Sequence, residues 1–201
     1  MRQAVIQNLK QIINRNVEAI TLQDDQKSYF AKSLEKYFTR LSENEHESEE
    51  FQKNNFRDFL KAIIPNKQIN TSGRIDLAIY NGISTNSNVG VIVEYKKVDN
   101  KSEMMSKENI NSKSFRELIA YYLRERVINK NIEVKKGIIT NGYEFFVIDS
   151  NELERCFYNN KALVGNFTKF ERKQLSSVRT DFLFDDVISV SYTHLRAHET
   201  C

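Results

Sequence analysis

Three charged residues in otherwise apolar stretches are the first candidates for chemistry: Asp76, Glu94 and Lys96. Asp76 lies within RIDLAIY, and the other two end VIVEYKK. Because side chains alternate along a strand, Glu94 and Lys96 project from one face, and Asp76 can meet them if the two strands are neighbours. Two carboxylates with open positions suit Mg²⁺. A lysine beside them can orient or deprotonate a water, or stabilise a pentacovalent phosphate.

A cross-strand salt bridge on a solvated face is the alternative, and a lone Glu-x-Lys in a strand favours it. The wider arrangement favours a functional site. Asp76 stands in an apolar strand, and Glu-x-Lys follows eighteen residues later, at the end of a strand that is apolar on both faces. A long helix comes next. We therefore interpret Asp76, Glu94 and Lys96 as candidate catalytic residues, with the two acids as metal ligands.

The elements that must position these residues follow from the spacing of apolar side chains. Short apolar runs predict four strands, and an Asn-Gly pair at 141–142 predicts a hairpin between the last two. Apolar residues recurring every three or four positions predict a helix between the second and third strands, and a short helix after the hairpin. The strands are 74–80, 89–97, 136–140 and 144–149, and the helices are 112–129 and 151–158.

Three further helices are predicted before the first strand, over 5–20, 24–41 and 44–64, where Pro65 ends the last one. On that third helix Glu45, Glu49 and Gln52 fall on the apolar face, whereas Glu50 points away. This order of elements predicts an α/β fold, with a small mixed sheet flanked by helices and preceded by an N-terminal helical segment.

Composition excludes several classes of protein. Of 201 residues, 40% are hydrophobic and 28% charged, which excludes wholesale disorder. No apolar run approaches the roughly 20 residues of a membrane span. Two cysteines exclude a disulfide scaffold and favour a reducing cytoplasm. The net charge is only +3, but residues 95–136 hold eleven basic and six acidic residues, which suits either a polyanion partner or a solvated lysine-rich surface.

The acid and the Glu-x-Lys resemble the PD-(D/E)xK phosphodiesterase superfamily, whose fold is called restriction-endonuclease-like. Asp76 matches the first acid and Glu94-Tyr95-Lys96 matches E-x-K, while Ile75 replaces the proline. On the following helix, Glu117 and Tyr121 resemble the Q-x-x-x-Y element of the RecB-like branch, with Glu in place of Gln. Residues four apart share a helix face. An exposed helix face is the alternative for this pair.

A closer resemblance covers residues 44–188, through segments such as ESEEFQKNNFRDFL and KGIITNGYEFFVID. These are similar to the N-terminal region of type IIG restriction–modification enzymes, which join a nuclease to an adenine-N6 DNA methyltransferase. The resemblance implies a prokaryotic cytoplasmic enzyme that cleaves double-stranded DNA with Mg²⁺, with a homodimer as one way to cut both strands. It also implies an acid on the first core helix, for which Glu49 is the candidate; Glu45 and Gln52 are weaker ones, and a surface charge is the alternative. The basic residues expected to contact DNA phosphates are Lys97, Lys101, Lys113 and Arg116.

The expected organisation has four parts. Residues 1–43 form a helical segment, 44–150 the nuclease core, 151–190 the start of a connection to a missing methyltransferase region, and 191–201 a non-native tail. S-adenosylmethionine is expected only for that missing region. The tail carries His194, His198 and Cys201 at a spacing that suggests zinc, but a fourth ligand is lacking, and SYTHLRAHET resembles translated sequencing-adapter read-through.

Two other functions remain open. One is a DNA-binding or protein-interaction module on a nuclease-like scaffold that has lost its chemistry. The other is the nuclease subunit of a different restriction system or of a repair system.

Overall fold

The computed structural model describes residues 23–172. The helix predicted over 5–20 and the tail with His194, His198 and Cys201 lie outside the described residues. Within the described part of the chain, no helix has the length and apolar character needed to span a membrane.

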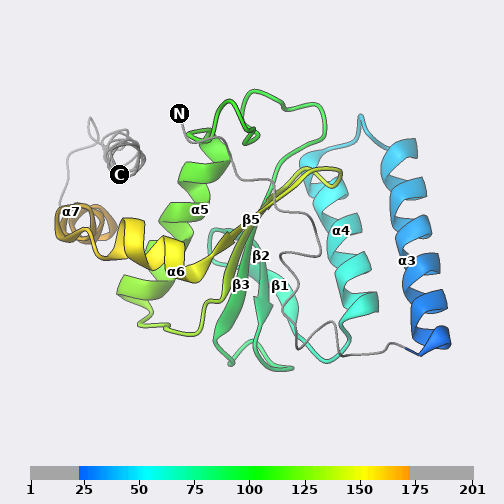
Figure 1. Ribbon diagram of the computed structural model, residues 1–201, viewed down its shortest axis with the longest axis horizontal. Helices are drawn as coiled ribbons and strands as arrows, with labels where there is room; N and C mark the ends of the chain where they lie inside the picture. The colour runs from blue at the N-terminus through cyan, green and yellow to red at the C-terminus, as the bar shows by residue number, and fades with distance from the viewer. Residues whose placement is uncertain (1–22, 173–201) are drawn as a thin grey trace, which may run out of the picture.

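The centre of the fold is a five-stranded mixed sheet with strand order β1-β2-β3-β4-β5 (Figure 1). Neighbouring strands are antiparallel except for β3 and β4, which are parallel and are joined by a helical crossover. The predicted α/β fold with a mixed sheet is thereby confirmed. The strands are β1 (Ile69–Ser72), β2 (Ile75–Tyr80), β3 (Val89–Tyr95), β4 (Lys136–Thr140) and β5 (Phe145–Asp149).

Strand β1 was not predicted from the sequence. It has only four residues, INTS, and of these only Ile69 is buried. A strand this short and polar gives almost no alternating pattern, so its pairing with β2, and not its own sequence, reveals it. It forms one edge of the sheet, beside the strand that carries Asp76.

Helices α3 (Asp24–Glu43) and α4 (Glu49–Ile63) cover one face of the sheet, at the right of Figure 1. Helix α4 begins five residues later than predicted because Ser48 is its N-cap: the Ser48 hydroxyl accepts the Phe51 backbone N–H at 3.2 Å. This later start sets which residues of the helix reach the sheet.

The opposite face is covered by α5 (Lys113–Leu123), which continues as the π-helical turn η1 (Arg124–Ile128), and by three later elements. Their side chains Leu153, Phe157, Leu163 and Phe167 lie in the same core as α5, so residues 150–171 pack on this side of the sheet. These elements are α6 (Ser150–Leu153), the π-helical turn η2 (Glu154–Tyr158) and α7 (Lys161–Glu171).

Two cores result from the alternation of side chains along β2 and β3. Leu77 and Val93 are opposite each other and face α3 and α4, whereas Ala78 and Ile92 are opposite each other and lie in the core with α5. Near the C-terminal end of β3, the even-numbered residues therefore face α5. By this alternation, Glu94 is expected on the α5 face and Tyr95 on the α4 face.

The turn between β4 and β5 is fixed by contacts from the α4 side. Gly142 has a φ of 93°, and its carbonyl accepts the Tyr37 hydroxyl at 3.3 Å. The Tyr95 hydroxyl donates to the neighbouring carbonyl of Asn141, also at 3.3 Å. Tyr95 is fully buried, so the residue between Glu94 and Lys96 ties the end of β3 to this turn.

We predict that Gly142→Ala lowers the free energy of unfolding by about 2–4 kcal/mol. An alanine Cβ there would lie 2.6 Å from the Tyr37 Oη and 2.8 Å from Leu41, in a backbone conformation that disfavours L side chains. The control is Gly165→Ala in α7, whose Cβ would meet nothing within 4 Å. Gly165→Ala should raise the free energy of unfolding by about 0.5–1 kcal/mol. Urea denaturation measures both, and equal effects would contradict the close approach at Gly142.

Candidate functional site

The two acids predicted as metal ligands come from neighbouring antiparallel strands. Leu77 is opposite Val93, so one step further along the same register Asp76 is opposite Glu94. Directly opposed residues share a sheet face, with Cβ atoms typically about 4.5–5.5 Å apart. The Tyr95 backbone N–H also donates to the Asp76 Oδ2 at 3.0 Å. The pairing of β2 with β3 thus brings the two acids together.

Glu94 is a buried carboxylate with one oxygen left unsatisfied. Its residue is 1% exposed, and its Oε1 lies 2.7 Å from the Lys96 Nζ. Its Oε2 is buried and has no hydrogen-bond partner. Burial, followed by the charge of Asp76, raises the pKa of Glu94 well above its ordinary value. The protein thus holds a carboxylate where its charged form is disfavoured unless another cation approaches.

Lys96 is the ammonium that partly neutralises this site. Its Nζ lies 2.7 Å from Glu94 and 2.7 Å from the Glu117 Oε2 on α5. Burial alone would lower its pKa, but Glu94 and Glu117 outweigh burial and raise it. The Lys96 backbone N–H bonds the Thr140 carbonyl at 2.9 Å, which continues the pairing of β3 with β4 and fixes where the side chain begins.

The predicted pair on the crossover helix also reaches this site. Glu117 accepts the Lys96 ammonium, and its side chain is 23% exposed. Tyr121, one turn later, has its pKa raised by burial and then by the charges of Glu94, Glu117 and Asp76. Glu117 therefore faces the acidic cluster and does not lie on a solvated helix face, and Tyr121, four residues on, shares its side of α5. Their catalytic roles stay a prediction.

The acid predicted on the first core helix lies beside the site's backbone. The Glu49 Oε2 accepts the Lys97 backbone N–H at 3.2 Å, and the buried Gln52 Oε1 accepts that of Val98 at 3.0 Å. Both side chains therefore hold the segment that follows Lys96. Glu45 does not join them; its carboxylate accepts a tyrosine hydroxyl of the β4–β5 turn.

Sequence reasoning missed Lys53, a buried lysine on α4. It is 8% exposed, and its Nζ lies 3.1 Å from the Asp76 Oδ1 and 2.7 Å from the Glu50 Oε2. Glu50, predicted to point away, is indeed largely exposed, yet it is linked to Asp76 through this ammonium. The i,i+3 spacing of Glu50 and Lys53 is compatible with an ion pair on the helix surface, but nothing in that spacing indicates burial of Lys53 against a strand.

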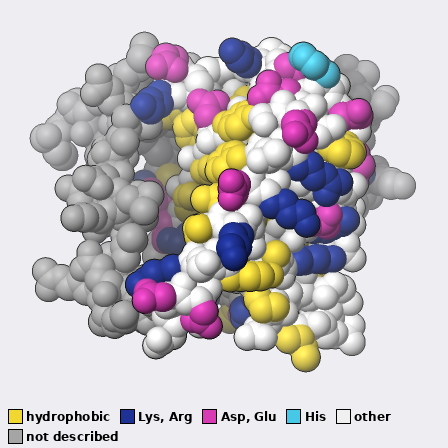
Figure 2. Space-filling model, turned by 90° about the vertical axis from the view of Figure 1, so that its right-hand side faces the viewer, with side chains coloured by type: hydrophobic (Ala, Val, Ile, Leu, Met, Phe, Trp, Pro, Cys, Tyr) yellow, Lys and Arg dark blue, Asp and Glu magenta, His cyan; other side chains and the backbone are white. Residues whose placement is uncertain are grey.

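The residues predicted to contact DNA lie on the segment after β3 and on early α5. Lys97 pairs with Asp99 at 2.9 Å and Lys113 with Glu103 at 2.8 Å, while Lys101 is exposed. Surface pairs of this kind contribute little stability, so a phosphate can replace the acidic partner. Arg116 is half-buried. Figure 2 shows a different face, on the α3 side, where acidic and basic side chains intermingle.

The donor set fits a hard divalent cation, although the side chains are not yet arranged around one. In residues 23–172, no group of three or more His, Cys, Asp and Glu side chains is placed so that it could hold a metal ion, whereas Mg²⁺ is often held by only one or two carboxylates. Lys53 and Lys96 stand among the carboxylates. The unsatisfied, buried Glu94 Oε2 beside Asp76 is nevertheless the kind of oxygen that Mg²⁺ binds.

Comparison with known proteins identifies a family without an assigned activity. A family model described as a domain of unknown function (DUF7149) matches residues 7–201. The chain belongs to this family. No curated protein and no solved structure matches the chain. The matched range of this DUF7149 chain includes 191–201, the segment predicted to be a non-native tail, which lies outside the described residues.

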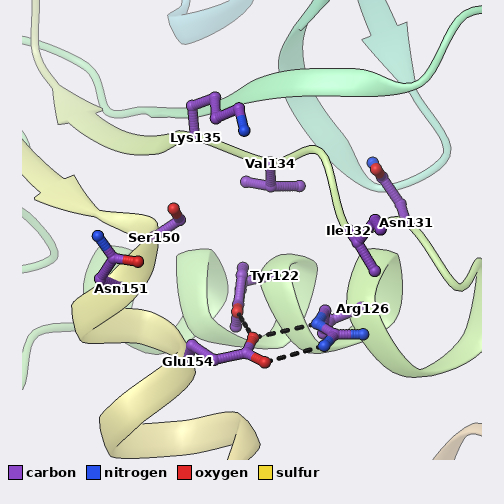
Figure 3. Close-up of a pocket in the computed structure, with 9 residues that line it drawn as sticks. All are labelled: Tyr122, Arg126, Asn131, Ile132, Val134, Lys135, Ser150, Asn151 and Glu154. Atoms are coloured by element: carbon purple, nitrogen blue, oxygen red, sulfur yellow. Dashed lines mark hydrogen bonds and ion pairs between the residues drawn. The ribbon is translucent and has the colours of Figure 1, made fainter.

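A second feature, a pocket of about 280 Å³, lies between α5, α6 and the segment that leads into β4 (Figure 3). Glu154 bonds the Tyr122 hydroxyl at 2.6 Å and both nitrogens of an Arg126 fork at 2.9 and 3.0 Å. The central polar groups of this pocket therefore have hydrogen-bond partners within the protein. The Glu94 Oε2 at the first site has no such partner.

We predict that Glu94→Gln stabilises the metal-free protein, and does so more at pH 8 than at pH 5. A carboxyl with a raised pKa keeps its proton longer in the folded state than in the unfolded chain, so wild-type stability falls as pH rises through that pKa. Glutamine does not ionise, so the variant does not lose stability in this way as pH rises. Melting temperatures of both proteins in EDTA between pH 5 and pH 8 test this prediction.

The matched control is Glu35→Gln, an exposed glutamate on α3. It should leave the melting temperature unchanged at every pH. A stabilisation by Glu94→Gln that is independent of pH would show that desolvation of the charged form is not the cause.

Proposed function

We propose that this chain is a Mg²⁺-dependent nuclease domain that hydrolyses phosphodiester bonds of double-stranded DNA. The observation that carries the proposal is the buried Glu94 carboxylate with an unsatisfied oxygen, opposite Asp76 and beside a protonated lysine. A purely structural ion pair would not need the second Glu94 carboxylate oxygen to be buried without a hydrogen bond at 1% residue exposure. A role for the Glu94 Oε2 as a ligand of a divalent cation would account for this arrangement.

Each residue then has a separate role. Asp76 and Glu94 would hold Mg²⁺, which when bound polarises a phosphate oxygen and lowers the pKa of a water. Lys96 keeps its proton at neutral pH, as lysines ordinarily do, and its raised pKa makes it a still weaker base, which favours donating to negative phosphate oxygens over deprotonating water. Glu117 orients the Lys96 ammonium, and Tyr121 offers a hydroxyl beside the same carboxylates.

The wider setting is also part of the proposal. The resemblance to PD-(D/E)xK nucleases of type IIG restriction–modification enzymes supports a prokaryotic cytoplasmic setting and site-specific cleavage. It also supports a methyltransferase that binds S-adenosylmethionine elsewhere in a longer parent protein. Two copies of the chain would place one active site on each DNA strand.

A catalytically silent DNA-binding or interaction module is the second candidate. The specific observation in its favour is that Lys53 and Lys96 already neutralise much of the acidic cluster, as a structural network would. The two candidates differ in whether the cluster binds a divalent cation and whether DNA is cut.

We expect the wild-type chain to cut plasmid DNA in Mg²⁺ and not in EDTA. Asp76→Asn, Glu94→Gln and Lys96→Met should each reduce the rate by roughly 100-fold or more, because each removes a charge required in the transition state. Gel electrophoresis of supercoiled plasmid in Mg²⁺, Ca²⁺ and EDTA measures this. Glu35→Gln is the control, and near-wild-type cleavage by any of the three variants would remove that residue from the mechanism.

DNA binding by this chain should be weak, independent of sequence and strongly dependent on salt. Phosphate contacts release counterions but read no bases. Alanine at Lys97, Lys101 and Lys113 together should reduce the slope of log K against log salt by about one unit per lost contact. Fluorescence anisotropy with two unrelated duplexes tests this, with Lys32→Ala/Lys36→Ala on α3 as the control. Tight binding to one duplex alone would place a recognition element within the chain.

A further inference from the structure

Lys53 is a second ammonium at the acidic site and belongs to none of the motifs. It projects from α4 and lies 3.1 Å from the Asp76 Oδ1, while its residue is only 8% exposed. Its other partner is the Glu50 Oε2 at 2.7 Å. Lys96 is held separately, by Glu94 and Glu117 at 2.7 Å and by Glu103 at 3.8 Å.

The position of Lys53 follows from the charges around it. A carboxylate that is partly buried, as Asp76 is with a side chain 19% exposed, is stabilised by a nearby cation and by hydrogen bonds. Asp76 stands opposite Glu94, and Lys96 is already shared by three other carboxylates, of Glu94, Glu117 and, at 3.8 Å, Glu103. Lys53 therefore supplies the cation that Asp76 needs when no metal is bound.

We propose that Lys53 is a positioning residue that takes the place of a divalent cation at Asp76 in the metal-free protein, and that the cation binds by displacing its ammonium from the Asp76 Oδ1. This inference rests on the proposed function, because it takes Asp76 and Glu94 as the ligands. Lys53 holds Asp76 in place between turnovers and leaves it when the metal arrives.

Glu50 is an alternative ion-pair partner for the displaced Lys53 ammonium. It lies three residues before Lys53 on the same helix, and its side chain is 61% exposed. The pair can thus persist at the surface after the contact with Asp76 is broken, without leaving a buried charge unpaired. A lysine with Asp76 as its only partner would resist displacement.

The experiment measures the affinity of Mn²⁺ for the whole chain by titration calorimetry. In Lys53→Met the cation has no ammonium to displace, so the dissociation constant should fall about tenfold or more. In Glu50→Gln the ammonium loses its alternative partner, so the constant should rise severalfold. The control Lys61→Met removes the same charge about 12 Å further along α4, beyond a Debye length, and should leave the constant within twofold.

A double-mutant cycle separates displacement from simple charge effects. If Glu50 acts by receiving the ammonium, Glu50→Gln has no effect on Mn²⁺ affinity once Lys53 is methionine. Independent electrostatic effects would instead add, and that result overturns the proposal. If the methionine variant does not fold in EDTA, Lys53→Gln keeps a hydrogen bond to Asp76 without the charge and is expected to bind Mn²⁺ tighter than wild type as well.

Failure of this inference differs from failure of the proposed function. A wild-type chain that binds neither Mn²⁺ nor Mg²⁺ at millimolar concentration overturns both. Tight wild-type binding with an unchanged or weaker constant in Lys53→Met overturns only the role of Lys53. A crystal structure with Mn²⁺ bound supports the inference if the Lys53 ammonium has left Asp76, and overturns it if that contact is intact.

Discussion

The site depends on the burial of Glu94 beside another acid. A carboxylate at 1% exposure opposite Asp76 is tolerated because Lys96 meets it at 2.7 Å and is itself held by a carboxylate on the crossover helix. This requirement links the layers of the fold. The sheet brings the acids together, α5 supplies Glu117, and α4 supplies the ammonium that meets Asp76.

Much of this arrangement could be predicted from the sequence. The alternation in RIDLAIY and VIVEYKK, together with the Asn-Gly hairpin, predicted four of the five strands and the shared face of Asp76 and Glu94. The spacing of apolar residues predicted the crossover helix, and the resemblance to the Q-x-x-x-Y element singled out Glu117 and Tyr121 on it. These features could be predicted because side chains alternate along a strand and repeat about every 3.6 residues along a helix, so the position of a residue in the element sets the direction of its side chain.

Other features depended on tertiary contacts that no local pattern encodes. Strand β1 exists because β2 pairs with it. The start of α4 at Glu49, by contrast, depends on a local contact, because the Ser48 hydroxyl accepts the Phe51 backbone N–H. Lys53 reads as an exposed helix lysine, and only the approach of α4 to Asp76 buries it. Long-range charge pairing is therefore the part of the site that the sequence alone leaves open, and it is also the part that decides how the acids behave without a metal.

The residue at the centre of Glu-x-Lys has a consequence for how this family can diverge. A motif written in this way suggests that the middle position is free, yet Tyr95 is fully buried and its hydroxyl reaches the turn after β4. Its ring also packs 5.9 Å from that of Phe56. Substitution at this position would have to be accompanied by changes in the turn and in α4. We therefore expect substitutions at position 95 to be accompanied by substitutions in the β4–β5 turn and in α4, which lie far from it in the sequence. Variation at this position would then reflect changes in packing and not changes in the chemistry of the site.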